Sequence, residues 1–173
     1  MNRNLLILGA GIYGIIAKEI AENMGCFNKI SFIDDSNTKT PANDPVIGTT
    51  NDLSDLSDEY EYVAIAIGNA EIRADIARRI EADPKLKLAT LISPRAYVSP
   101  SAMIGEGCII EPMAVISFGA VLGKCTLVCA GAVINHGCVC GDIVQIDCNS
   151  TVTGYSTVPD KTKIPAGVVF VGE

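Results

Sequence analysis

The chain has a single histidine, His136, and imidazole is the side chain best suited to acid–base chemistry near neutral pH. A positioned histidine is the usual general base for acyl transfer, because it can take a proton from an amine or hydroxyl that attacks a carbonyl. A backbone N–H directed at the resulting oxyanion would meet the second requirement. The alternative interpretation is a lone surface histidine that has no role.

A second candidate site is the glycine-rich segment that contains Gly9, Gly11 and Gly14. It follows an expected strand and opens an expected helix, so its amides could cradle a phosphate at the helix N-terminus. Asp34 ends the next expected strand, where a carboxylate meets a ribose hydroxyl in dinucleotide-binding folds. The glycines could instead serve only to let the helix pack closely. An NAD-dependent oxidoreductase is disfavoured, because the chain shows no substrate domain with an acid–base pair.

A six-residue period from residue 92 onward supplies the elements that position His136. An apolar residue recurs at every sixth position: Ile92, Val98, Ile104, Ile110, Ile116, Leu122, Val128, Ile134, Cys140, Ile146, Val152, Val158, Ile164 and Phe170. A second series, four residues further on, is small or slim throughout. Six is neither a helical period nor a simple strand period. Hexapeptide repeats are typical of a parallel β-helix, in which short strands wind into stacked coils around an apolar column.

The period also predicts where the histidine lies. Three hexads, or about 18 residues, make one coil of such a helix. Prolines 94, 100 and 112 share the slot two residues after the apolar one, and proline cannot donate to a strand ladder, so this slot is a corner. His136 occupies the same slot, with Phe118 one coil before it and Gly154 one coil after it. The imidazole should therefore project beside a gap that admits a substrate carbonyl and exposes a backbone N–H.

The front half of the chain alternates between strands and helices. We expect strands at residues 5–8, 29–33 and 61–67, with helices ending near residue 24 and spanning about 71–81. Short links between such elements indicate parallel pairing in an open α/β sheet. The segment 83–90 reads as a linker. The sequence therefore predicts two domains, residues 1–84 and residues 85–173.

Composition limits the partners. The net charge of −7 and a pI near 4.7 argue against nucleic acid or an anionic membrane surface. No apolar run approaches the ~18 residues that span a bilayer, and glycines interrupt the N-terminal run, so we expect neither a membrane span nor a signal peptide. Seven cysteines without C-x-x-C spacing suggest free thiols in a reducing cytoplasm and no metal site. Cys108, Cys138 and Cys140 fall in apolar or small slots and read as packing residues.

Motifs from both halves together resemble one family. They are G-A-G-I-Y-G, F-I-D-D, P-V-I-G-T, A-I-G-N-A-E-I-R, A-T-L-I-S-P-R-A-Y-V-S-P-S-A and G-A-V-I-N-H-G-C-V-C-G-D. Over its whole length the chain is similar to the sugar O-acyl/N-acyltransferases of the sialic acid O-acetyltransferase type, which include hexapeptide-repeat nucleotide-amino-sugar acetyltransferases. The resemblance implies a Rossmann-like domain that holds a nucleotide sugar and a left-handed β-helix that binds acetyl-CoA as co-substrate, with no metal. It also implies a homotrimer with active sites between adjacent helices.

The resemblance assigns roles to individual residues. His136 would be the catalytic base, the amide of Gly154 would meet the acetyl carbonyl, and Gln145 would line the acetyl-CoA site. The nucleotide-sugar pocket would comprise Gly9, Gly11, Tyr13, Gly14, Asp34, Asp35, Gly68, Asn69 and Arg73. The acceptor would be a UDP- or GDP-linked amino sugar or a sialic acid-like sugar, acetylated on an amine or a hydroxyl in bacterial surface glycan synthesis.

Three positions depart from the family pattern. Gly137 stands where an acidic residue usually orients the histidine, Gln145 replaces a second histidine, and Cys148 replaces a proline. The repeat also ends about two coils earlier than is usual in the family. Asn135 could orient the imidazole instead, and an acid restored at position 137 would be expected to raise the rate. The alternative function is a catalytically degenerate trimeric module that binds a nucleotide sugar or a partner enzyme.

Overall fold

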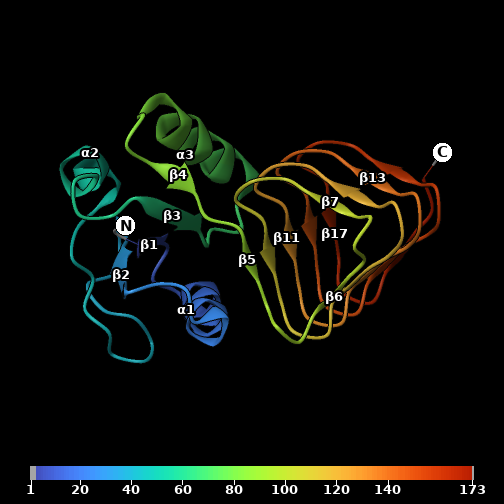
Figure 1. Cartoon of the computed structure of the whole chain (residues 1–173), viewed down its shortest axis with the longest axis horizontal. Helices are drawn as coiled ribbons and strands as arrows, with labels where there is room; N and C mark the ends of the chain where they lie inside the picture. Colours follow the sequence, from blue (N-terminus) through green and yellow to red (C-terminus); the bar gives the residue numbers. More distant parts are fainter. Residues whose placement is uncertain (1–2, 173) are drawn as a thin grey trace. The chain divides into compact units, whose positions relative to one another are not determined.

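The computed structural model describes residues 3–172 as two compact units, which divide between Leu91 and Ile92 (Figure 1). The N-terminal unit is a parallel sheet with helices, and the described residues 91–172 form a stack of short parallel strands in three sheets. The predicted fold class, an α/β domain of Rossmann-like type followed by a left-handed parallel β-helix, is confirmed. Within residues 3–172, no helix has the length and apolar character needed to cross a membrane.

The N-terminal sheet contains β1 (Asn4–Leu8), β2 (Lys29–Ile33), β3 (Tyr62–Ile65) and β4 (Lys87–Leu88), in the order β2-β1-β3-β4 with parallel pairing throughout. The helical elements are α1 (Ile12–Met24), the 3-10 turn η1 (Thr50–Asp52), α2 (Leu53–Leu56) and α3 (Ala70–Ala82). In Figure 1, α1 and α3 lie on opposite sides of this sheet. A parallel strand covered on both faces is apolar without alternation, which explains the fully buried run from Leu5 to Leu8.

Strand β4 lies within the segment 83–90, which the sequence suggested as a linker. Lys87 and Leu88 pair with Tyr62 and Val63 of β3 and extend the sheet at one edge. A strand of two residues is too short for its alternation to be recognised in a sequence. The change of period near residue 91 therefore marks the start of the coils, whereas the first sheet continues beyond residue 84.

The β-helix consists of two-residue strands that return every third hexad. One sheet contains β5 (Leu91–Ile92), β8 (Ile109–Ile110), β11 (Leu127–Val128), β14 (Gln145–Ile146) and β17 (Lys163–Ile164). A second contains β6 (Tyr97–Val98), β9 (Val115–Ile116), β12 (Val133–Ile134), β15 (Thr151–Val152) and β18 (Val169–Phe170). The third contains β7 (Met103–Ile104), β10 (Val121–Leu122), β13 (Val139–Cys140) and β16 (Thr157–Val158). Val121 pairs with Val139 and Leu122 with Cys140, so neighbouring coils are 18 residues apart, as predicted.

The apolar series forms the column inside the coils. Its members from Ile110 to Ile164 are buried in one cluster, whereas Ile92, Val98, Ile104 and Phe170 are partly buried because they belong to the end coils. Cys108, Cys138 and Cys140 lie in the same cluster. Burial raises the pKa of Cys108 and that of Cys140 to about 12, so these thiols stay protonated at neutral pH. They are packing residues, as their slots indicated.

Most corners between the strands of the β-helix have a residue in the left-handed backbone region. From residue 107 to residue 167 it recurs every six residues: Gly107, Met113, Gly119, Cys125, Gly131, Gly137, Ile143, Asn149, Tyr155, Lys161 and Gly167. Glycine adopts this conformation freely, but other residues do so at a cost of about 1–2 kcal/mol. Glycines share this slot with larger residues, of which Met113 and Tyr155 are exposed whereas Cys125 and Ile143 are buried.

Candidate active site

His136 lies at the exposed corner that follows β12, in the slot that the period assigned to it. The amide of Gly137 donates to the carbonyl of Phe118 at 2.9 Å, and the amide of Tyr155 donates to the carbonyl of His136 at 3.0 Å. These bonds stack the corners of three successive coils. Phe118, 73% exposed, and Gly154 occupy the histidine slot of the coils on either side. The structure thus brings His136 and Gly154 together.

Asn135 fixes the orientation of the imidazole. Its Oδ1 accepts a hydrogen bond of 2.8 Å from the backbone N–H of His136 and lies 2.8 Å from Nδ1 of the same residue. Since a backbone N–H can only donate, the atom that faces it must be the amide oxygen. That oxygen cannot donate to Nδ1, so Nδ1 must carry the proton. The neutral ring therefore presents an unprotonated Nε2, the form that a general base requires.

Gly154 leaves the space that this Nε2 occupies. A β-carbon on Gly154 would lie 2.8 Å from Nε2 and 2.9 Å from Cε1 of His136. Within residues 3–172, neither Nε2 nor the N–H of Gly154 has a hydrogen-bond partner. A free acceptor on an oriented imidazole thus lies beside a free backbone donor. This pair could remove a proton from a nucleophile and stabilise an oxyanion.

Tyr155 is a neighbour of His136 that sequence reasoning did not identify. The two ring centroids are 5.0 Å apart with an interplanar angle of 84°, an edge-to-face contact. A β-carbon on Gly137 would lie 2.6 Å from Cδ1 and 2.7 Å from Cε1 of Tyr155. The tyrosine ring therefore fills the space of the side chain that Gly137 lacks. The sequence held a signal for this contact, because Tyr155 follows Gly137 by one coil in the same corner slot.

Gln145 lies on β14, in a different sheet from the strand that precedes His136. Its Nε2 donates to Oδ1 of Asp147 at 2.7 Å, and the second carboxylate oxygen of Asp147 lies 3.3 Å from Nζ of Lys163. Its Oε1 is buried and has no hydrogen-bond partner within residues 3–172. Within one chain, the structure does not bring Gln145 to the histidine corner.

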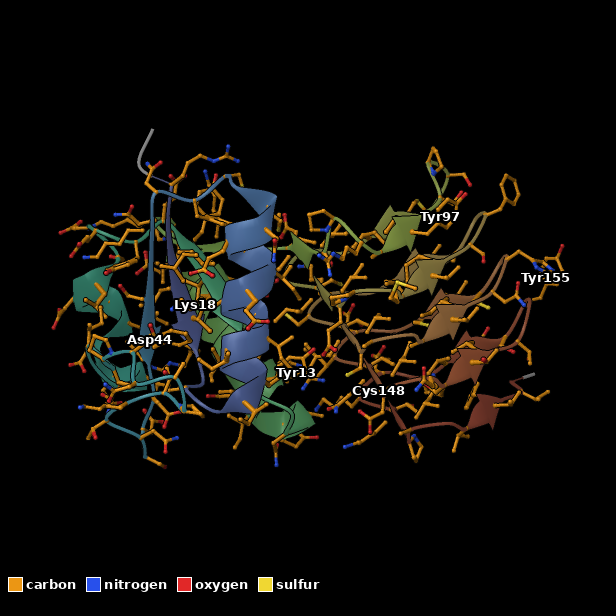
Figure 2. All side chains as sticks on the ribbon, turned by 90° about the horizontal axis from the view of Figure 1, so that it is seen from below. Tyr13, Lys18, Asp44, Tyr97, Cys148 and Tyr155 are labelled. Atoms are coloured by element: carbon orange, nitrogen blue, oxygen red, sulfur yellow. The ribbon has the colours of Figure 1, made fainter. Side chains whose placement is uncertain are left out.

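Potential metal ligands converge at the corner that follows β8, β11 and β14. Ligand atoms of Glu111, Cys129 and Cys148 lie within 4.8 Å of one another, and Oε2 of Glu111 accepts a hydrogen bond of 3.0 Å from the amide of Ala130. The C-x-x-C pattern does not reveal this group, because its residues are about one coil apart in the sequence and meet only when the coils stack. It lies at a different corner from His136, and Figure 2 shows Cys148 well separated from Tyr155.

In the N-terminal unit, the three loop glycines have different structural roles. A β-carbon on Gly9 would lie 2.6 Å from the carbonyl oxygen of Ala66, and one on Gly14 would overlap the carbonyl oxygen of Gly9. Packing therefore requires both. A β-carbon on Gly11 would meet nothing within 4 Å, although Gly11 is the N-cap of α1 and no side chain caps this helix end. Only Gly11 is left for a ligand that approaches the amides of α1.

The two aspartates after β2 make hydrogen bonds within the loops. Asp34 accepts from the amide of Ala10 at 2.7 Å through Oδ2, and from the amides of Ser36 and Asn37 through Oδ1. Burial acts to raise the pKa of Asp34, but these hydrogen bonds outweigh it and hold the pKa below its ordinary value. Asp35 accepts from both the amide and the hydroxyl of Thr50. A cavity of about 260 Å³ adjoins both carboxylates, lined also by Ser36, Asn37, Thr38, Val46, Gly48 and Thr49.

The remaining residues of the expected pocket lie at the ends of β1 and β3. Asn69 caps α3, its Oδ1 accepting from the amides of Glu71 and Ile72. Arg73 is fully buried, and its Nη1 donates to the carbonyls of Ile67 at 2.7 Å and Gly68 at 3.1 Å, which fixes the loop after β3. Tyr13 is half-buried in the first turn of α1 (Figure 2). Because all these loops follow parallel strands, they share the carboxyl edge of the sheet, where ligands of such folds bind.

Comparison with known proteins identifies relatives for both units. A model of the PglD N-terminal domain matches residues 4–80. The acetyltransferase domain of PglB from Neisseria gonorrhoeae, solved in complex with acetyl coenzyme A, is 34% identical to this chain, with a TM-score of 0.90. The match covers 96% of this chain and 81% of that one. A second structure of the same domain is 31% identical, with a TM-score of 0.88, and covers 99% of this chain and 93% of that one.

A more distant match shares the fold. A mutant of perosamine N-acetyltransferase from Caulobacter crescentus, solved in complex with CoA and GDP-perosamine, is 20% identical, with a TM-score of 0.63. The match covers 92% of this chain and 90% of that one. At this identity the likeness shows the fold alone.

Proposed function

Because this chain belongs to the family of hexapeptide-repeat sugar acetyltransferases that includes the PglB acetyltransferase domain, we propose that it transfers an acetyl group from acetyl-CoA to a nucleotide sugar. The observation that carries the proposal is the Nε2 of His136 beside the N–H of Gly154, neither of which has a hydrogen-bond partner among the described residues 3–172. An imidazole held in the Nδ1-protonated form next to a free backbone donor matches the two demands of acyl transfer.

The reaction follows from these two groups. Nε2 of His136 takes a proton from the amine or hydroxyl of the acceptor as that group attacks the thioester carbonyl. A C–N or C–O bond forms, and the N–H of Gly154 stabilises the oxyanion. The C–S bond then breaks, and the thiolate takes the proton from the imidazolium, which returns CoA as the thiol and His136 as the neutral base. A positioned base typically contributes 10²–10⁴-fold and an oxyanion donor about 10²–10³-fold.

The acceptor site is proposed at the carboxyl edge of the N-terminal sheet. The amides at the start of α1, which Gly11 leaves accessible, would hold the diphosphate, and the cavity beside Asp34 and Asp35 would hold the nucleoside. Asn69 and Arg73 would then act indirectly, since they hold the loop after β3 in place. The nucleotide is uridine or guanosine diphosphate, and the acetylated sugar carries an amine or a hydroxyl.

A homotrimer would complete the active site. His136 follows β12 and Gln145 lies on β14 in a different sheet, and adjacent protomers would bring the two residues to one acetyl-CoA. The β-helix also exposes large apolar side chains, which partner subunits normally cover: Tyr97, Met103, Met113, Phe118 and Val139. Light scattering at micromolar concentration should give the trimer mass. A monomer with full activity would overturn this arrangement.

The test of the function is a thiol-release assay with acetyl-CoA over UDP- and GDP-linked amino sugars, the corresponding hydroxyl sugars and a sialic acid. We expect turnover with one class of nucleotide sugar. Because the substrates would be acetyl-CoA and a nucleotide sugar, we expect the reaction to take place in the cytoplasm and to serve the assembly of surface glycans. Absence of turnover with every acceptor, together with nucleotide-sugar binding, would instead support the degenerate binding module. The intact pair of His136 and Gly154 favours the enzyme.

A further inference from the structure

Tyr155 occupies a corner slot whose left-handed backbone conformation recurs along the β-helix. Its backbone φ is +61°, in the left-handed region that a bulky residue adopts only at a cost. Its side chain is 77% exposed, so little apolar area is removed from water in return. The preceding coils have glycine in this slot, at Gly119 and Gly137. The tyrosine ring makes a contact in this slot that a glycine could not make.

That contact is the one with His136. We infer that Tyr155 is a positioning residue for the catalytic base, an inference that rests on the proposed acyl transfer. The imidazole is held at Nδ1 by Asn135, and its Nε2 has no partner within residues 3–172. The hydrogen bond to Asn135 holds the ring at one end only. The edge-to-face contact with Tyr155, at 5.0 Å between centroids, restricts the motion of the ring.

Gly137 is part of the same arrangement. Its missing β-carbon would lie 2.6 Å from the tyrosine ring, so the ring can reach the imidazole only because residue 137 has no side chain. Gly137, which stands where the family usually has an acidic residue, thus leaves the room that the ring of Tyr155 occupies. Asn135 and Tyr155 together orient the imidazole with an uncharged amide and an uncharged phenol ring, where other members would use a carboxylate.

The single histidine allows a test that does not depend on turnover. In this chain of 173 residues only one imidazole gives NMR signals, so the ring of His136 is assigned without ambiguity. In the wild type we expect the Nδ1-protonated tautomer and ring-proton shifts that reflect the nearby tyrosine ring. Tyr155→Ala should remove these shifts and give a mixture of tautomers, whereas Tyr155→Phe should keep both features. Identical imidazole spectra for wild type and Tyr155→Ala would overturn the inference.

Kinetics supply the second readout. Tyr155→Ala should lower kcat by roughly ten- to a hundredfold with little change in KM for acetyl-CoA or the sugar, because misplacement of a base affects the chemical step. Tyr155→Phe should restore the rate. Lys161→Ala is the matched control, since Lys161 is also exposed with a positive φ but lies at a corner of another sheet. An equal loss in Lys161→Ala and Tyr155→Ala would point to general destabilisation of the corners and overturn the inference.

A double-mutant cycle separates this contact from its surroundings. Gly137→Ala should displace the tyrosine ring and lower kcat about as much as Tyr155→Ala does. Combining the two changes should add little, because both remove one contact. Fully additive losses would contradict the inference. A wild type that shows no thiol release would defeat the proposed function, while the NMR comparison would still decide whether Tyr155 holds the ring.

Discussion

Gly14 packs so closely against Gly9 that a β-carbon on Gly14 would overlap the carbonyl oxygen of Gly9, whereas a β-carbon on Gly11 would meet nothing within 4 Å. Two explanations for a glycine-rich loop, helix packing and ligand approach, therefore apply to different glycines of the same loop. Substitutions at Gly11 should therefore affect ligand binding, whereas substitutions at Gly14 should affect folding.

Gly11→Val should abolish binding of uridine and guanosine diphosphates without unfolding the N-terminal unit. The valine side chain would cover the amides of α1, while the φ of −81° at this position suits any residue. Loss of a preferred N-cap should cost at most about 1 kcal/mol. Calorimetry with each nucleotide measures the first effect and thermal unfolding the second. Gly14→Ala is the contrasting variant and should lower the melting temperature strongly. Wild-type affinity in Gly11→Val would mean that the loop does not contact a ligand.

Asp34→Asn should destabilise the N-terminal unit at neutral pH, and the difference from wild type should shrink in acid. Both carboxylate oxygens accept from backbone amides, so the NH₂ group of asparagine would face a donor. The pKa of Asp34 is lowered in the folded state. Its stabilising effect is therefore present above the ordinary aspartate pKa of about 3.9 and is lost as the pH falls through the folded value. Unfolding at about pH 7 and pH 3 measures this. A pH-independent difference would contradict the assignment.

His136→Ala should reduce kcat by about a hundredfold or more, the contribution of a positioned base. The affinity for acetyl-CoA should change little, because the imidazole acts on the proton of the acceptor. Steady-state kinetics and calorimetry measure the two quantities. His136→Ala with wild-type turnover would mean that another group is the base.

Gly154→Ala should lower turnover by perturbing the imidazole rather than the fold. The new β-carbon would come within 2.8 Å of Nε2, and the ring must move because it is the flexible partner. We expect a loss of roughly tenfold or more in kcat with an unchanged melting temperature. The histidine NMR signals of the variant should shift. Unperturbed signals together with full activity would show that Gly154 has no part in the site.

Gly137→Asp should lower the rate, which reverses the expectation that the family resemblance suggested. The left-handed backbone at Gly137 tolerates aspartate, but the side chain would collide with the ring of Tyr155. Combining Gly137→Asp with Tyr155→Ala should recover activity above that of Tyr155→Ala alone, since the carboxylate can then approach the imidazole. Measurement of kcat for the three variants checks this. A faster enzyme from Gly137→Asp alone would show that the ring yields easily.

The sequence by itself determined the β-helix, its inward residues and the neighbours of His136 along the coil axis. A strict six-residue period requires the same corner geometry in every coil, so residues 18 apart must stack, and Phe118, His136 and Gly154 fall into one column without knowledge of any contact. The open sheet, with its glycine loop after β1, was predictable for a similar reason, because short links between strands and helices permit few arrangements.

Only the tertiary structure determined which conformations the side chains adopt at the positions that the six-residue period assigns to them. Periodicity places a residue in a slot but does not choose its rotamer, so the tyrosine ring over Gly137 and the hydrogen bonds of Asp34 could not be read from spacing. Strand β4 escaped detection because two residues carry no pattern of their own and are held by the edge of β3. Such features depend on contacts between side chains and backbone of distant segments, which only the folded chain brings together.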